Sequence, residues 1–127
     1  MSKIKTSEGA RELTPFSIII NFRNEEQHLP TLLDSISELN YDFEKIEFLF
    51  INDGSTDPSL EILQQFQQKN PEINFQILER KPVSASAKKD GITQAVHFAN
   101  HDHIITTDAD CILPKNWLGA FHFHYIK

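Results

Sequence analysis

Cysteine is nearly absent from this chain of 127 residues, which contains only Cys111. One cysteine cannot form an internal disulfide, so the chain cannot belong to the small disulfide-stapled folds. The first residues also lack the charged start, apolar stretch and cleavage site of a secretory signal. We therefore expect a cytoplasmic protein, in which Cys111 is a small packing residue.

Long hydrophobic runs and an excess of positive charge are also missing. No apolar stretch approaches the roughly 20 residues that cross a bilayer. The 18 acidic residues outnumber the 12 basic ones, for a net charge of −6. No stripe of lysine and arginine with interleaved aromatic residues is present, so we expect no nucleic-acid partner. With 39% hydrophobic and 24% charged residues, the composition is that of an ordinary globular domain.

Strand and helix patterns alternate along the chain after a polar leader at residues 1–15. Apolar runs predict strands at residues 16–22, 46–52, 73–78 and 103–107. Helical spacing predicts helices at residues 29–39, from Pro58 to about residue 69, at residues 84–100, and after Pro114. Asn24 is expected to cap the first helix and Asp57 the second. This alternation predicts an α/β fold with a mostly parallel, Rossmann-like sheet and helices on both faces.

Three polar segments follow predicted strands directly, at residues 21–25, 53–55 and 108–110. Ligands of open α/β sheets bind beyond the carboxyl ends of the strands, so these segments predict one binding crevice. Asp108 and Asp110 lie on the same side of an extended segment and could bind Mg²⁺ or Mn²⁺ through oxygen, with water and a diphosphate completing the coordination. Each segment also has a simpler interpretation, as a helix cap or a solvated turn.

The third predicted helix carries Lys88 and Lys89 near its start, where a cation and a helix N-terminus together could attract phosphate. A solvated charged face is the alternative. The histidine pairs at residues 101–103 and 122–124 lack the i, i+4 spacing of a helical metal site, so we do not interpret them as ligands.

Four segments together resemble family 2 glycosyltransferases. They are Ser17-Ile-Ile-Ile-Asn-Phe-Arg-Asn-Glu25, Phe50-Ile-Asn-Asp-Gly-Ser-Thr-Asp57, Ala87-Lys-Lys-Asp-Gly-Ile92 and Thr107-Asp-Ala-Asp110. Their order and spacing agree with the family, whose GT-A fold binds a nucleoside-diphosphate sugar and a divalent metal. The resemblance implies a nucleotide-sugar-binding portion at residues 16–127 of a GT-A domain truncated at its C-terminus.

The resemblance also implies roles for individual residues. Asp53 matches the carboxylate that reads the base, and Lys88 falls where many members carry an arginine that holds the donor. Asp108 matches the first acid of the DxD motif, near the ribose or sugar, and Asp110 the second, which binds Mn²⁺ or Mg²⁺. Nucleotide-sugar binding is also expected of the polar segment after the first strand, at Asn21, Arg23 and Glu25. There the common family pattern has Pro and Tyr where this chain has Asn21 and Arg23, and the Arg23 guanidinium could replace the aromatic platform.

The implied activity is inverting, metal-dependent transfer of a sugar from a UDP- or GDP-linked donor to an acceptor hydroxyl, as in the synthesis of cell-envelope polysaccharide. The catalytic base is expected beyond Lys127, so the chain alone is expected to transfer nothing. The acceptor is expected to be a carbohydrate or a lipid-linked molecule. We expect an association with a membrane only through a segment outside this chain, and such a segment would place the whole protein at the cytoplasmic face of that membrane. Two alternatives stay open: a nucleotide-sugar-binding module without catalysis, and a Mg²⁺-binding signalling domain of flavodoxin-like shape.

Overall fold

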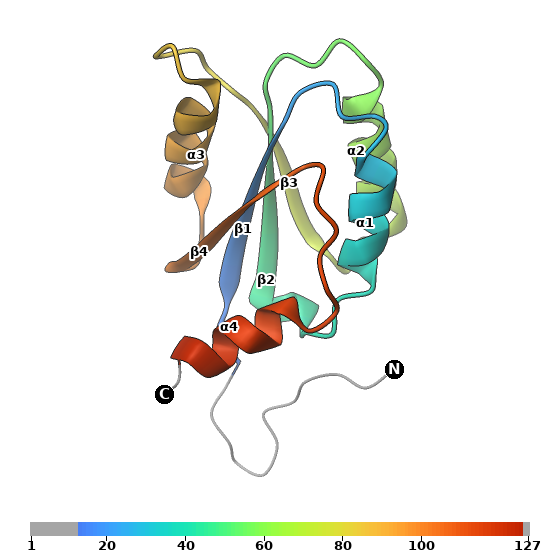
Figure 1. The fold of residues 1–127 in the computed structure, drawn as a ribbon, viewed down its shortest axis with the longest axis vertical. Coiled ribbons are helices and arrows are strands. Elements are labelled where there is room, and N and C mark those ends of the chain that lie inside the picture. The colour runs from blue at the N-terminus through green and yellow to red at the C-terminus, as the bar shows by residue number, and fades with distance from the viewer. Residues whose placement is uncertain (1–12, 126–127) are drawn as a thin grey trace.

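A four-stranded parallel sheet forms the centre of the molecule (Figure 1). The computed structural model describes residues 13–125. The strands are β1 (Phe16–Phe22), β2 (Ile46–Asn52), β3 (Asn74–Glu79) and β4 (His103–Asp108). Their order across the sheet is β3-β2-β1-β4, and every neighbouring pair is parallel. The expected α/β fold with a Rossmann-like sheet is confirmed.

The two central strands are buried on both faces. All seven residues of β2 are buried, and so are six of the seven in β1. Such strands need apolar side chains on both sides, which explains why their sequences are continuous apolar runs rather than alternating ones. β3 and β4 are more exposed and flank them.

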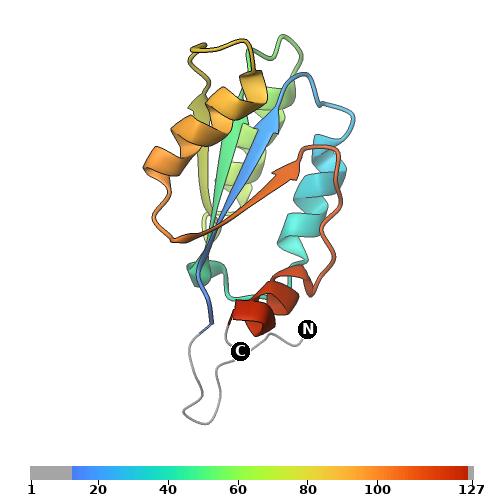
Figure 2. The same ribbon diagram turned by 60° about the vertical axis from the view of Figure 1, so that its left-hand side comes forward.

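Helices cover both faces of the sheet (Figures 1 and 2). α1 (Leu29–Ser37) and α2 (Ser59–Lys69) lie on one face, and α3 (Ala87–Phe98) lies on the other. A short 3-10 turn, η1 (Phe43–Lys45), precedes β2. α4 (Trp117–Tyr125) lies near the end of the sheet where β1 begins, and its Phe121 ring contacts that of Phe16.

Each face of the sheet has its own hydrophobic core. The larger core lies under α1 and α2 and includes Leu32 and Phe48. The smaller core lies under α3 and contains Ile19, Leu49, Ile51 and Ala95 as its fully buried members. Successive side chains of a strand point to opposite faces, so β1 and β2 each contribute to both cores.

The element boundaries differ from the expected ones in several places, and α1, β3 and β4 each begin or end one or two residues away from the expected position. The third helix spans residues 87–98 instead of 84–100, because Ser86 caps it by accepting a hydrogen bond from Lys89 N. α2 begins at Ser59, one residue after Pro58. The leader was expected to reach residue 15, but Leu13 and Thr14 are buried, and Tyr41 Oη donates to Thr14 O at 2.6 Å. These two residues therefore belong to the packed domain, and the rest of the expected leader, residues 1–12, lies outside the described residues.

Candidate functional site

The polar ends of the four strands meet on the face of the sheet that α3 covers. In the sheet register Asn21 pairs with Ile51 and with Asp108, and Asn52 pairs with Glu79. Asp53 and Arg80 each come one residue after the last of these pairs. Side chains alternate between faces, so Asn21, Asp53, Arg80 and Asp108 continue the rows of apolar side chains that pack under α3.

A cleft of about 240 Å³ opens at this end of the sheet. Its lining contains all six residues expected to bind the nucleotide sugar. The lining residues are Asn21, Phe22, Arg23, Glu25, Asp53, Ala87, Lys88 and Asp108. Segments that are as far apart as residues 21 and 108 in the sequence therefore form one site, as expected from the parallel topology.

Hydrogen bonds join the loop after β1 to the loop after β2. Asn24 has a positive φ of 52°, and its Oδ1 accepts hydrogen bonds from the backbone N–H groups of Thr56 and Asp57. Glu25 N donates to Ser59 Oγ at 2.8 Å. The expected role of Asn24 as the cap of α1 is wrong: the cap position is His28, and Asn24 instead organises the second loop. The two loops thus form one rim of the cleft.

Asp57 partly fulfils its expected role at α2. Its Oδ1 accepts a hydrogen bond from Ser59 N at 2.9 Å, at the start of the helix. Its Oδ2 accepts from Glu26 N, which belongs to the other loop. Asp57 therefore supports α2 and the rim of the cleft together.

The backbone around Asp53 is fixed by a tight turn. Gly54 has a φ of +66°, a conformation that glycine adopts without strain. Asn52 Oδ1 accepts a hydrogen bond from Ser55 N, and Asn52 Nδ2 donates to the carboxylate of Glu79. Asp53 N donates to Phe22 O at 2.9 Å. These contacts hold the Asp53 carboxylate at the cleft.

Arg80 and Asp90 were not identified from the sequence, but they form a chain of contacts with Asp53, which lines the cleft. Arg80 Nε donates to Asp53 Oδ1 at 2.6 Å, and Arg80 Nη1 donates to Asp90 Oδ2 at 3.2 Å. Asp90 is buried and accepts hydrogen bonds from Val83 N, Ser84 N and Ser84 Oγ. The hydrogen bonds from the Ser84 and Val83 backbone, then from the Ser84 hydroxyl, lower the pKa of Asp90 to about 2, and the Arg80 charge adds to this effect.

An exposed ion pair and a hydrogen-bonded histidine–carboxylate contact flank the cleft. Lys88 Nζ lies 3.0 Å from Asp108 Oδ1, and both side chains are more than half exposed. Glu25 Oε1 lies 2.8 Å from His28 Nδ1 within the first turn before α1. An exposed pair such as Lys88 and Asp108 contributes little to stability, so a ligand could separate the two side chains at small cost.

Asp108, Asp110 and Cys111 form the cluster of candidate metal ligands in the described part of the chain. One ligand atom from each of the three residues lies within 4.8 Å of the others. Both carboxylates are exposed, and Cys111 is partly exposed rather than packed inside. Carboxylate oxygens suit hard divalent cations, whereas a thiol does not, so Asp108 and Asp110 are the residues that could hold such an ion.

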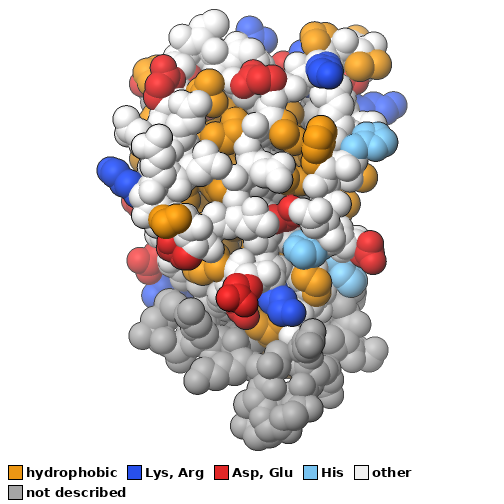
Figure 3. All heavy atoms as spheres, turned by 180° about the vertical axis from the view of Figure 1, so that it is seen from behind, with side chains coloured by type: hydrophobic (Ala, Val, Ile, Leu, Met, Phe, Trp, Pro, Cys, Tyr) orange, Lys and Arg blue, Asp and Glu red, His pale blue; other side chains and the backbone are white. Residues whose placement is uncertain are grey.

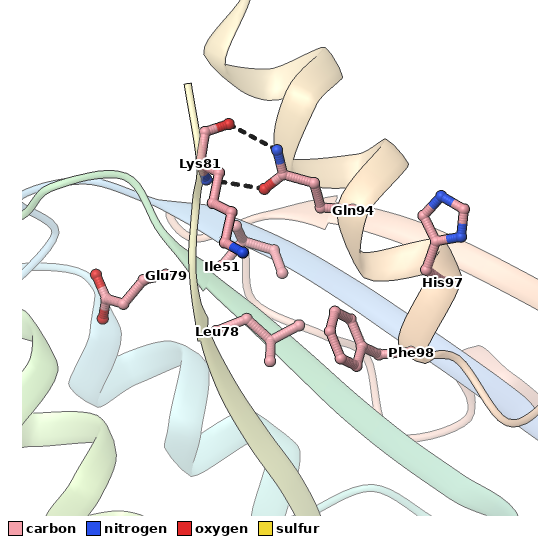
Figure 4. Close-up of a pocket in the computed structure, with 7 residues that line it drawn as sticks. All are labelled: Ile51, Leu78, Glu79, Lys81, Gln94, His97 and Phe98. Carbon is pink, nitrogen blue, oxygen red and sulfur yellow. Dashed lines mark hydrogen bonds between the residues drawn. The ribbon is translucent and has the colours of Figure 1, made fainter. Parts of the chain in front are cut away.

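A second cleft lies at the β3 side of the sheet, between β3 and α3 (Figure 4). Its volume is about 210 Å³, and Leu78 and Phe98 face each other across it. Gln94 spans the top of this cleft by bonding both Lys81 N and Lys81 O. The space-filling view from the side opposite to Figure 1 shows hydrophobic side chains among polar groups in the middle of the molecular surface (Figure 3). This cleft has no group of converging acids, and we do not assign it the binding function.

Comparisons with known proteins identify the family of this chain. A model of the family described as "Glycosyl transferase family 2" matches residues 17–123, so the chain belongs to this family. The chain is 27% identical over 105 residues to the poly-beta-1,6-N-acetyl-D-glucosamine synthase of Staphylococcus aureus (strain COL). That match covers 83% of this chain and 24% of the synthase.

Solved structures show the same fold. The mannosyltransferase PcManGT from Pyrobaculum calidifontis, in complex with GDP-Man and Mn²⁺, superposes with a TM-score of 0.70 at 23% identity, covering 78% of this chain and 28% of that one. TarS 1–349 from S. aureus, in complex with UDP-GlcNAc, gives a TM-score of 0.73 at 22% identity, covering 85% and 30%. The chain thus spans about a quarter of the length of the curated relatives it matches. Within residues 13–125, no helix has the length and apolar character that crossing a membrane requires.

Proposed function

We propose that this chain binds the nucleoside-diphosphate part of a sugar donor at the carboxyl end of its sheet. The observation that carries the proposal is the convergence of Asn21, Arg23, Glu25, Asp53, Lys88 and Asp108 on one cleft. Its volume of about 240 Å³ is below the roughly 300–1,000 Å³ of typical ligand sites. We therefore expect the described residues to enclose one part of the donor, with the rest of it contacting other residues of the protein.

The charges around the cleft suit a nucleotide with a diphosphate. Asp53 offers a carboxylate that can accept a hydrogen bond from a base N–H, and Arg23 can stack on the face of the base. Lys88 supplies a positive charge beside the first turn of α3, where the helix N-terminus also favours anions. The phosphates would then lie between Lys88 and the acids after β4.

Asp108 and Asp110 are the residues that would hold a divalent cation, Mn²⁺ or Mg²⁺. The fit rests on the proximity of their carboxylate oxygens and on their exposure beside the cleft. Such a cation, when bound, neutralises negative charge on the diphosphate leaving group. A complex with Mn²⁺ and GDP-Man in a structural relative supports this part of the proposal.

The whole protein would then be a transferase. We propose that it transfers a sugar from the donor to an acceptor hydroxyl with inversion, and that the base for this step comes from residues outside this chain. The names of the relatives support a polysaccharide acceptor, as in the poly-beta-1,6-N-acetyl-D-glucosamine synthase. We place this reaction on the cytoplasmic side of the membrane, where cell-envelope polysaccharide would be made. We expect no transfer by the chain alone.

Calorimetric titration tests the donor site directly. The chain is titrated with UDP and with GDP, each with and without Mn²⁺, and the titrations are repeated with Asp110→Ala. The expected result is binding of a nucleoside diphosphate that Mn²⁺ strengthens in the wild-type chain and not in the variant. Lys115→Ala, an exposed change away from the cleft, is the control. If a folded wild-type chain bound neither nucleotide, the proposal would be wrong.

A further inference from the structure

Arg80 is held between two carboxylates of different character. It follows β3 directly, and its backbone N–H donates to Asn52 O at 2.9 Å, which extends the sheet by one step. Its side chain is only 15% exposed and bonds Asp53 through Nε and Asp90 through Nη1. A guanidinium that is this little exposed and has two anionic partners has little freedom to move.

Asp90 is the fixed side of this chain of contacts. It is 6% exposed, lies in the first turn of α3, and accepts three hydrogen bonds from residues 83 and 84 in addition to that from Arg80. A carboxylate with so many partners cannot turn toward a ligand. Arg80 is therefore fixed to α3, and its hydrogen bond to Asp53 fixes the position of the Asp53 carboxylate.

The two oxygens of Asp53 differ as a result. Oδ1 accepts the short, charge-assisted hydrogen bond from Arg80, whereas Oδ2 accepts none from the described part of the chain. The Asp53 side chain is 20% exposed and lines the cleft. A ligand therefore meets one free acceptor oxygen, beside a second oxygen whose charge Arg80 already neutralises.

We infer that Arg80 is a positioning residue that makes the site selective for a base with a single N–H donor. This inference rests on the donor-binding function proposed above. Uracil presents one N–H, at N3, between two carbonyl oxygens, and thymine presents the same edge. Guanine presents two adjacent donors, N1–H and N2–H, which require both oxygens of a carboxylate. With Oδ1 engaged by a cation, the second guanine donor meets a weakened acceptor and a positive charge, so the uracil edge fits and the guanine edge does not.

The wild-type chain tests the selectivity without any substitution. Affinities for UDP, dTDP and GDP are measured by calorimetry in Mn²⁺, together with UDP methylated at N3. UDP and dTDP should bind at least about tenfold more tightly than GDP, and methylation at N3 should lower the affinity for UDP by a similar factor. Each difference corresponds to about one hydrogen bond to a charged group. Equal affinity for UDP and GDP, or unchanged affinity after methylation, would overturn the inference. Failure to bind any nucleotide would instead overturn the donor-binding function itself.

Substitution of Arg80 tests its role. Arg80→Gln should lower the affinity for UDP by about tenfold and the affinity for GDP by less than about threefold. The ratio of the UDP affinity to the GDP affinity should therefore decrease. Arg80→Lys keeps the charge but cannot bond Asp53 and Asp90 with the geometry of a guanidinium, so it should restore only part of the preference for UDP over GDP. Lys81→Gln, an exposed neighbour, is the matched control. A purely structural role for Arg80 predicts that both affinities fall by the same factor, and that outcome would overturn the inference; thermal unfolding verifies that each variant is folded.

Discussion

Lys88 Nζ and Asp108 Oδ1 lie 3.0 Å apart and join the first turn of α3 to the end of β4 beside the cleft. Both residues were expected to contact the donor, and the structure shows them in contact with each other. Both side chains are more than 60% exposed, so the pair is readily separated. A diphosphate would compete with Asp108 for Lys88, while a cation would compete with Lys88 for Asp108.

Removing the charge of Lys88 should weaken nucleotide binding without unfolding the chain. We expect Lys88→Met to lower the affinity for a nucleoside diphosphate by about tenfold, because one charge-assisted contact to phosphate is lost. The unfolding free energy should change by less than about 0.5 kcal/mol, as for other exposed pairs. Calorimetry and urea unfolding measure the two quantities. Lys89→Met, the exposed neighbour on the same helix, should change neither; equal losses in both variants would argue against a specific contact.

Asp90 should make the stability of the chain depend on pH in acid. Its pKa is lowered from 3.8 to about 2 in the folded state, so the stability that it contributes is complete above its ordinary pKa and is lost as the pH falls through about 2. Wild-type chain should therefore be more stable than Asp90→Asn near neutral pH, and the difference should shrink between about pH 4 and pH 2. Urea unfolding across this range measures it. Asp34→Asn, an exposed change on α1, is the control, and a difference that did not vary with pH would contradict the prediction.

The fold could be predicted because its central strands have an unambiguous pattern. β1 and β2 are buried on both faces, and only a continuous apolar run satisfies that environment. The alternation of strands and helices then determined a parallel sheet, and the parallel sheet brought the segments around Asn21, Asp53 and Asp108 together. The location of the candidate site thus followed from topology alone.

The contacts of Arg80, Asp90 and Asn24 could not be predicted, because they depend on strand ends and loop conformations that no sequence pattern specifies. The third strand was expected to end at Leu78, but its ladder continues to Glu79, and this places Arg80 beside Asp53. Asp90 was read as part of a helix, and its interaction with Ser84 arises from the conformation of the loop before α3. Asn24 has a left-handed backbone, which turns its side chain to the neighbouring loop instead of to the helix.

Gly91 should be intolerant of a side chain because of Asn21. A Cβ atom at Gly91 would lie 2.3 Å from Asn21 Oδ1 and 3.1 Å from Ile51 Cγ2. This Asn21 oxygen is buried and has no hydrogen-bond partner among residues 13–125. Inside a helix, glycine to alanine is normally stabilising by about 1 kcal/mol. Here we expect Gly91→Ala to destabilise by about 1–3 kcal/mol, because the clash must be relieved by a shift of α3 or of Asn21.

A double-mutant cycle isolates the clash. In an Asn21→Ala background the first obstacle is absent, so Gly91→Ala should cost at least about 1 kcal/mol less than in the wild-type chain. Urea unfolding of the four proteins gives the coupling. Additive effects would show that the contact with Asn21 does not set the cost.

Glu47 should be important for stability, although it lies at the opposite end of the sheet from the cleft. It is fully buried in β2, where its Oε2 accepts hydrogen bonds from Ser17 Oγ and Asn100 N, and its Oε1 accepts from Asn100 Nδ2. These bonds tie the turn between α3 and β4 to the two central strands.

Glu47→Gln replaces one acceptor oxygen by an amide donor that faces other donors, so we expect a loss of about 2–3 kcal/mol in unfolding free energy. The exposed change Glu61→Gln on α2 should cost less than about 0.5 kcal/mol. Because Glu47 is remote from Asp53 and Lys88, the folded fraction of Glu47→Gln should bind a nucleoside diphosphate as tightly as wild type; a large loss of affinity would mean that the α3–β4 turn also supports the donor site.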